Sequence, residues 1–431
     1  MSKLRNQQQS REIYGVQIDK PILIIEDSKP LAYLLSSFIT KQWDCDVHIA
    51  YSHAEAKEYL KRYRYDYHLA ICDITLPDAP NGEIIDLVKK AKVKMIAISG
   101  NYEADYVKSI INKGAIDFID KGNKNAYPYA VELVGRLFKN HLIKILVVDD
   151  SESAAGVVAL MLEKQNFQVI ITGNGKKALE ILEENKDIRI ILTDYNMPEM
   201  DGVELTVKIR QIYSKDQLAI IGLSGINDDL LSSNFIKNGA NDFLIKPFSY
   251  NELLCRVNQN MDMLEHMEHI KSLANHDYMT KVYNRRYFFT QGNDIYLSSK
   301  EIQKRLTICM MDIDHFKQVN DNYGHDCGDV VLIHFAKVLN DFFDEYLVAR
   351  LGGEEFSVLF DDIDYQESLD LLDSFRQKIE ETAISCDDVT LSITVSIGVT
   401  NQPSDTIDAM LKLSDDNLYQ AKDTGRNKVV G

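Results

Sequence analysis

The sequence predicts an α/β protein that begins with two similar parallel-sheet units, and two observations support this fold class. Short apolar segments of strand length alternate with longer segments whose apolar residues recur at helical spacing. This series of segments occurs twice, because residues 21–28 recur as residues 144–151, and residues 70–73 recur as residues 191–194. Strands that alternate with helices typically form a doubly wound parallel sheet. We therefore expect one such sheet in each copy of the repeat.

Each copy of the repeat carries acidic residues, a serine and a lysine directly after apolar strands. Ligands of parallel sheets bind beyond the carboxyl ends of the strands, so these side chains should converge at one edge. Two acids after the first strand and one after the third can share a Mg²⁺ ion, which relieves their repulsion. The third acid can then attack a phosphoryl donor in line, while the lysine and serine bind phosphoryl oxygens. The alternative is structural, because acids at strand ends often cap the next helix.

This set of groups resembles the receiver domain of two-component response regulators, which has a flavodoxin-like fold. The resemblance covers residues 21–140 and 144–262, and it implies that Asp73 and Asp194 accept the phosphoryl group. It also implies one Mg²⁺ per receiver, held with these aspartates by two further acids in each unit, which are Glu26 and Asp27 in the first and Asp149 and Asp150 in the second. The implied switch residues are a hydroxyl, an aromatic ring and a lysine in each unit, namely Ser99, Phe118 and Lys121, then Ser224, Phe243 and Lys246.

The second unit follows the receiver pattern throughout, whereas the first unit departs from it. Glu26 replaces an aspartate, and the loop that follows Asp73 is one residue longer than its counterpart. Gly122 follows the lysine of the first unit, where the second unit has Pro247. Because a proline would fix this loop, we expect a less sharply assembled site in the first unit.

Composition limits the remaining function classes. At 431 residues, 45% of them hydrophobic, the chain should hold two to four packed domains. A net charge of −18 argues against nucleic acid or an anionic membrane as the main partner. The sequence has no apolar run of the roughly 18 residues that a membrane-spanning helix needs. Six scattered cysteines without a C-x-x-C pair are typical of reduced thiols, so we expect a cytoplasmic protein with no membrane insertion.

A single helix is predicted for residues 251–275, because this stretch lacks proline and glycine and has apolar residues at helical spacing. Its apolar stripe could pair with the same helix of a second subunit. Packing of Val257 and Met261 against their own sheet is the alternative. Residues 263–275 would then link the second unit to the rest of the chain, and residues 1–20 would form a polar tail.

Two stretches of the C-terminal third combine apolar strands with acidic residues. Apolar runs on either side of Gly352 and Gly353 predict a β-hairpin, since glycine permits the positive φ of a tight turn. Glu354 and Glu355 follow, and two adjacent carboxylates repel unless a cation lies between them. A second apolar strand, residues 306–311, leads to Asp312, whose carboxylate at the strand end suits Mg²⁺. The alternative for the hairpin is a solvated acidic turn.

Residues 311–329 and 350–356 resemble the two main signatures of the GGDEF family of diguanylate cyclases, and residues 277–286 and 421–427 resemble two further signatures. The resemblance implies an α+β, palm-like domain over residues 276–431. It implies that two GTP molecules condense to cyclic di-GMP and two pyrophosphates, with two Mg²⁺ ions per site. The implied metal ligands are Asp312, Glu354, Glu355 and the backbone carbonyl of Ile313, and Glu354 is also the proposed general base. We therefore expect Asp312 and Glu354 to face each other across adjacent strands.

The resemblance also implies how GTP is bound. Asn320 and Asp329 would read the guanine, since an amide and a carboxylate match its hydrogen-bonding edge. Lys317, Lys422 and Arg426 would neutralise the triphosphate. The remaining implied substrate contacts are Phe316, Gly352 and Gly353.

One departure from the GGDEF pattern concerns feedback. Many members carry R-x-x-D before the hairpin as a product-binding inhibitory site, whereas residues 343–346 read Phe-Asp-Glu-Tyr here. The missing arginine predicts that product does not inhibit strongly through this segment.

Together these features predict a response regulator with two receivers and a diguanylate cyclase output. It would act as a homodimer, because each site holds one GTP, and a cognate histidine kinase or phosphotransfer protein would phosphorylate it. One alternative is a catalytically silent GTP-binding or scaffold module that signals by contact. Another is a different nucleotidyl cyclase on a related palm fold, which the guanine-reading pair disfavours.

Overall fold

The computed structural model describes residues 19–225, 229–302, 305–386 and 389–431, and the chain forms two compact units that divide after Leu264. Most of the predicted polar tail lies outside the described residues. None of the described helices is long and apolar enough to cross a bilayer.

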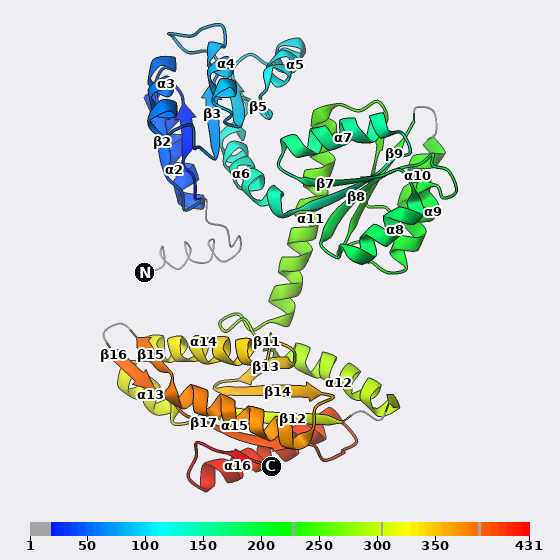
Figure 1. The fold of residues 1–431 in the computed structure, drawn as a ribbon. Coiled ribbons are helices and arrows are strands. Elements are labelled where there is room, and N and C mark those ends of the chain that lie inside the picture. The colour runs from blue at the N-terminus through cyan, green and yellow to red at the C-terminus, as the bar shows by residue number, and fades with distance from the viewer. Residues whose placement is uncertain (1–18, 226–228, 303–304, 387–388) are drawn as a thin grey trace. The chain divides into compact units, whose positions relative to one another are not determined.

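The first unit of the fold opens with a five-stranded parallel sheet of strand order β2-β1-β3-β4-β5 (Figure 1). Its strands are β1 (Ile22–Ile25), β2 (Val47–Ala50), β3 (Leu69–Asp73), β4 (Met95–Ser99) and β5 (Asp117–Asp120). Its helices are α2 (Lys29–Gln42), α3 (His53–Arg62), α4 (Glu83–Lys90), α5 (Ala104–Lys113) and α6 (Ala126–Lys139). Strands β1, β3 and β4 are buried along their whole length, because α2 and α6 cover one face and α3, α4 and α5 the other.

A short 3₁₀ turn, η1 (Asn140–Leu142), leads to a second parallel sheet of order β10-β9-β8-β6-β7. Its strands are β6 (Lys144–Val148), β7 (Gln168–Thr172), β8 (Ile188–Asp194), β9 (Ala219–Ser224) and β10 (Asp242–Ile245). Its helices are α7 (Glu152–Lys164), α8 (Gly175–Glu184), α9 (Gly202–Arg210), α10 (Asp229–Lys237) and α11 (Tyr250–Asn275). Both sheets have the 2-1-3-4-5 order of flavodoxin-like folds, so the predicted fold class is confirmed.

Helix α11 is one continuous helix of 26 residues, as the sequence predicts (Figure 1). Val257, Met261 and Leu264 are buried in the core that the second sheet shares with α7. Further along, Ile270 and Leu273 are 57% and 64% exposed. The first half of α11 therefore packs against its own sheet, and the apolar side chains of its last turns face solvent.

The C-terminal unit contains a six-stranded sheet of order β11-β13-β14-β12-β17-β18, mostly antiparallel at its centre. Its strands are β11 (Tyr283–Asn284), β12 (Leu306–Ile313), β13 (Leu347–Gly352), β14 (Glu355–Asp361), β17 (Val395–Thr400) and β18 (Val429–Val430). Its helices are α12 (Arg285–Ile302), α13 (Phe316–Tyr323), α14 (His325–Phe342), α15 (Tyr365–Glu381) and α16 (Ile407–Asp423). Strands β15 (Ala383–Cys386) and β16 (Val389–Ser392) form a separate hairpin. This α+β arrangement agrees with the predicted third domain.

Candidate functional sites

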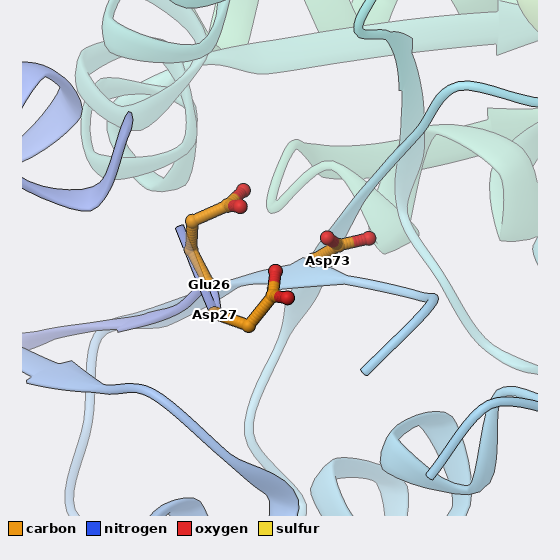
Figure 2. Close-up of side chains that lie close together, drawn as sticks. All are labelled: Glu26, Asp27 and Asp73. Atoms are coloured by element: carbon orange, nitrogen blue, oxygen red, sulfur yellow. The ribbon is translucent and has the colours of Figure 1, made fainter. Parts of the chain in front are cut away.

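The predicted acids of the first receiver converge at the carboxyl edge of its sheet. Glu26 and Asp27 follow β1, Asp73 ends β3, and Figure 2 shows the three side chains close together. One carboxylate oxygen from each lies within 4.8 Å of the others, which is a spacing that a single hard cation can bridge. Glu26 and Asp73 are buried and Asp27 is exposed, so an ion held there would keep access to solvent and to a phosphoryl donor.

Lys121 completes this site after β5. Its Nζ lies 2.8 Å from Glu26 Oε2 and 2.6 Å from Asp73 Oδ2. Burial raises the pKa of Glu26 above its usual range, although the ammonium of Lys121 opposes this rise. The side chain of Ser99, at the end of β4, is buried and accepts a hydrogen bond of 3.2 Å from the backbone N–H of Asn101.

The loop after Lys121 is fixed by Asp120 instead of by a proline. Asp120 Oδ1 accepts a hydrogen bond of 2.8 Å from the backbone N–H of Gly122. We expected the first site to be less sharply assembled, yet Lys121 contacts its two acids at 2.8 Å and 2.6 Å, and the equivalent lysine of the second site contacts its two acids at 2.6 Å each. The sequence comparison of the two units missed this local hydrogen bond.

The second receiver repeats the lysine bridge. Lys246 Nζ lies 2.6 Å from Asp149 Oδ2 and 2.6 Å from Asp194 Oδ1. Burial raises the pKa of Asp194, against the opposing effect of Lys246. Within the described residues, the acids of this site are not gathered within the 4.8 Å spacing seen in the first receiver.

The predicted switch residues of the two receivers differ in burial. Ser99 and Ser224 are both buried at the ends of their strands. Phe118 is 8% exposed and packs edge-on against Tyr106, with ring centroids 6.4 Å apart, whereas Phe243 is half-buried. An inward turn of the aromatic ring would therefore bury less additional surface for Phe118 than for Phe243.

In the C-terminal unit, the predicted hairpin is formed by β13 and β14, with Gly353 at φ 52° in the turn. Asp312 on β12 is paired with Glu355 on β14, and Glu354 lies in the turn. We predicted that Asp312 and Glu354 would face each other across adjacent strands, and the register is one residue different. Because the turn takes up Gly353 and Glu354, β14 begins only at Glu355.

Asp312 is the electrostatic centre of this site. It is 7% exposed, and Lys422 Nζ lies 2.8 Å from its Oδ2. Burial raises the pKa of Asp312, Lys422 opposes this, and the nearby charges of Glu354 and Glu355 raise it further. Three carboxylates that repel one another are suited to a bound divalent cation. The backbone of Ile313 continues directly from Asp312, so its carbonyl is available to the same ion.

The predicted guanine readers come from consecutive helices. Asn320 lies on α13 and Asp329 on α14, and both are half-buried. A Cβ atom at Gly328 would lie 2.0 Å from Asn320 Oδ1, so only glycine leaves room for this amide. The sequence analysis did not single out Gly328. A glycine directly before Asp329, within a stretch of helical pattern, could have indicated a close contact at this position.

The predicted phosphate-binding cations are accessible, whereas Phe316 is not. Lys317 and Arg426 are exposed and Lys422 is half-buried. Phe316 is 7% exposed and belongs to the main core of this unit, next to the space over Gly328. Its side chain therefore packs in the core near Gly328 and Asn320 and does not face solvent.

Arg350 connects the hairpin turn to Asp277. Its Nε and Nη2 donate to the carbonyl oxygen of Gly353 at 2.9 Å and 2.7 Å, and its Nη1 lies 2.9 Å from Asp277 Oδ1. The pKa of Asp277 is lowered: burial raises it, but hydrogen bonds from Thr280 and Arg350 outweigh that effect. Asp277 thus fixes the hairpin through Arg350.

Family models match the three sheet-containing regions. The model of the response regulator receiver domain matches residues 22–127 and 145–258, and the model described as diguanylate cyclase, GGDEF domain, matches residues 274–428. The two receiver matches lie inside the ranges predicted for those domains, and the GGDEF match begins two residues before the predicted boundary at residue 276.

Individual proteins match over different shares of their length. Response regulator PleD of Caulobacter vibrioides is 29% identical over 300 residues, which cover 67% of this chain and 65% of PleD. Diguanylate cyclase A of Treponema denticola is 36% identical over 160 residues, covering 36% of this chain and 43% of that protein. A solved structure, described as a probable two-component system response regulator/GGDEF domain protein, is 36% identical with a TM-score of 0.52 and covers 57% of this chain and 100% of its own. The chain thus spans slightly less than two thirds of PleD.

Proposed function

Because the chain belongs to the response regulators that join receiver domains to a GGDEF domain, we propose that it is a phosphorylation-controlled diguanylate cyclase. The proposed reaction condenses two GTP molecules into cyclic di-GMP and two pyrophosphates. The observation that carries this proposal is the hairpin between β13 and β14, which brings Glu354 and Glu355 beside the buried carboxylate of Asp312.

The carboxylates of Asp312, Glu354 and Glu355, with the carbonyl of Ile313, would hold the magnesium ions of the cyclase. Bound magnesium would polarise the α-phosphate and lower the pKa of the attacking 3′-hydroxyl. The pairing of Asp312 with Lys422 supports this assignment, since the lysine neutralises the acid at 2.8 Å and is free to turn to a phosphate once a cation takes its place.

The residues of the chain would then bind GTP and move its proton. Asn320 and Asp329 read the guanine, and the three cations Lys317, Lys422 and Arg426 stabilise the triphosphate charge. The 3′-oxygen of one GTP attacks the α-phosphorus of the other, pyrophosphate leaves, and Glu354 accepts the hydroxyl proton. The 3′-oxygen of the second GTP then attacks the α-phosphorus of the first in the same way, which releases the second pyrophosphate and closes the ring.

A homodimer follows from this stoichiometry. Each cyclase site would bind one GTP, so both bonds form only when two sites face each other. Control of the dimer is then control of the rate, because the reaction depends on how the two substrates are held.

The receivers would supply that control through Asp73 and Asp194, with a histidine kinase or phosphotransfer protein as donor. The aspartate oxygen attacks the donor phosphorus, and the donor group leaves with its electron pair. The lysine of each site already contacts the aspartate at 2.6 Å and would bind a phosphoryl oxygen, with one Mg²⁺ held by the acids.

The test is to incubate the purified full chain with GTP and Mg²⁺ and to identify the product by chromatography and mass spectrometry. We expect cyclic di-GMP and pyrophosphate in a ratio of one to two. Tight GTP binding without turnover would favour the silent scaffold, and another cyclic nucleotide would favour a different cyclase; either result would overturn the proposal.

A further inference from the structure

The buried carboxylate of Asp314 joins three segments that surround the cyclase site. Asp314 directly follows β12, is 4% exposed, and donates its backbone N–H to the carbonyl oxygen of Thr394 at 2.9 Å. Its Oδ1 accepts a hydrogen bond of 2.6 Å from Ser396 Oγ, and its Oδ2 accepts one of 2.7 Å from Thr394 Oγ1. Oδ2 also accepts the backbone N–H of Asn427 at 3.0 Å. Both oxygens are therefore used, and all three of these donors are uncharged groups.

The Asn427 contact reaches a turn that is unfavourable by itself. Gly425, Arg426 and Asn427 have φ values of 110°, 61° and 48°. The two residues other than glycine occupy the left-handed region, which is unfavourable for a residue with a Cβ atom. Such a conformation persists only where surrounding contacts fix it. Asp314 supplies one such contact, and Arg376 supplies another by donating from Nη1 to Asn427 Oδ1 at 2.9 Å.

This turn carries Arg426, one of the cations assigned to the triphosphate. Lys422, the other cation at the end of α16, already contacts Asp312, two residues before Asp314. The end of β12 and the residue after it, residues 312–314, therefore contact residues 422–427 at two points. The contact between Asp312 and Lys422 lies at the proposed metal site. The contact between Asp314 and Asn427 lies directly after Arg426 in the chain.

We propose that Asp314 is a positioning residue, which holds the C-terminal turn in the conformation that aims the Arg426 guanidinium at the substrate phosphates. This inference rests on the proposed cyclase function. It does not make Asp314 a catalytic residue, because its carboxylate is buried and fully engaged with Thr394, Ser396 and Asn427.

The test compares Asp314→Asn with the wild-type chain in initial-rate kinetics, GTP-binding calorimetry and thermal unfolding. An asparagine amide cannot accept at both positions, so the turn should lose one of its contacts. We expect the KM and the Kd for GTP to rise about tenfold, the usual effect of losing one hydrogen bond to a charged group, while kcat changes less. Wild-type KM and Kd in a folded Asp314→Asn variant would overturn the proposal.

A double-mutant cycle separates positioning from general destabilisation. If Asp314 acts through Arg426, the variant Asp314→Asn/Arg426→Ala should bind GTP no more weakly than Arg426→Ala alone. Additive losses would contradict the inference. Should Asp314→Asn fail to fold, the pair Thr394→Val and Thr394→Ser applies the same test, because only valine removes the hydroxyl. We expect weaker GTP binding with valine than with serine, and equal binding would count against the proposal.

Failure of the proposed function has a different signature. If the wild-type chain makes no cyclic di-GMP, the cyclase assignment fails, whereas the Kd values for GTP still decide the role of Asp314. If the wild-type chain makes the product but the Kd values do not change, only the role of Asp314 fails.

Discussion

Tyr250, the first residue of α11, donates a hydrogen bond of 2.9 Å from its Oη to the carbonyl oxygen of Ile116, the residue before β5. Gln165, buried at the end of α7, donates to the same carbonyl at 3.0 Å and to Tyr250 Oη at 3.1 Å. The strand that carries Phe118 and leads to Lys121 is therefore attached to the helix that leaves the second receiver. We propose that this contact is a route by which phosphorylation of Asp73 would act through the second receiver.

We predict that Asp194 is the stronger of the two control points, because α11 continues from its own sheet into the cyclase. Treated with a phosphoryl mimic, Asp194→Asn should lose most of the activation, and Asp73→Asn should keep part of it. Couplings of this kind are typically about 5- to 150-fold. Dimerisation and cyclic di-GMP production are measured together. If Asp194→Asn responds like the wild type while Asp73→Asn is locked off, the order of the two receivers is reversed.

The second prediction concerns the turn of the hairpin. Glu354→Ala should abolish cyclic di-GMP formation, because it removes both a metal ligand and the proposed base, while the fold and receiver phosphorylation stay intact. The matched control is Glu381→Ala, since Glu381 is an exposed glutamate at the end of α15 and should leave the rate unchanged. Near-native turnover by Glu354→Ala, measured as product per minute, would show that the assignment is wrong.

A third prediction concerns feedback by the product. Phe343 is 1% exposed and packs against Phe375 with ring centroids 5.3 Å apart, and Tyr346 packs against Phe360 at 4.8 Å. These two residues are committed to the core and offer no cation to a phosphate. Adding cyclic di-GMP to initial-rate assays should therefore give no strong inhibition through this segment. Submicromolar inhibition that disappears when residues 343–346 are changed would contradict this expectation.

The fourth prediction concerns stability without metal. The pKa of Asp312 is raised chiefly by burial, so the folded state binds its proton more tightly than the unfolded state does. Its charge therefore destabilises the metal-free fold above the raised pKa. Asp312→Asn should increase the Tm at neutral pH by about 2–4 °C, which corresponds to roughly 1 kcal/mol in a domain of 150–250 residues.

Acidification distinguishes this cause from others. As the pH falls through the raised pKa of Asp312 toward its ordinary value, the wild type should gain stability relative to Asp312→Asn, and the difference in Tm should shrink. Mg²⁺ should raise the Tm of the wild type more than that of the variant. Calorimetric scans with and without Mg²⁺ measure both effects. A pH-independent difference in Tm would rule out the burial of this charge as its cause.

The sequence predicted those features that depend on local pattern. The alternation of apolar strands and helices defines the two parallel sheets, and Gly353 marks the hairpin turn. It could not predict that Glu355, and not Glu354, is paired with Asp312, because register depends on which residues the turn takes up. The sequence could not predict the hydrogen bond from the backbone of Gly122 to Asp120 either, since a short polar side chain there can adopt many conformations. Asp314 finds its partners in segments distant along the chain, and no local pattern encodes such contacts.

Because α11 is continuous from Tyr250 to Asn275, the number of residues in this helix sets the direction in which its last turns point. Each residue of an α-helix adds about 1.5 Å and, at 3.6 residues per turn, about 100° of rotation. Inserting a single residue after Leu264 would therefore rotate the remaining turns of α11 by more than a quarter turn about the helix axis, whereas inserting seven would nearly restore their original direction. Under the control that we propose, the length of this helix would therefore matter as much as the residues on its surface.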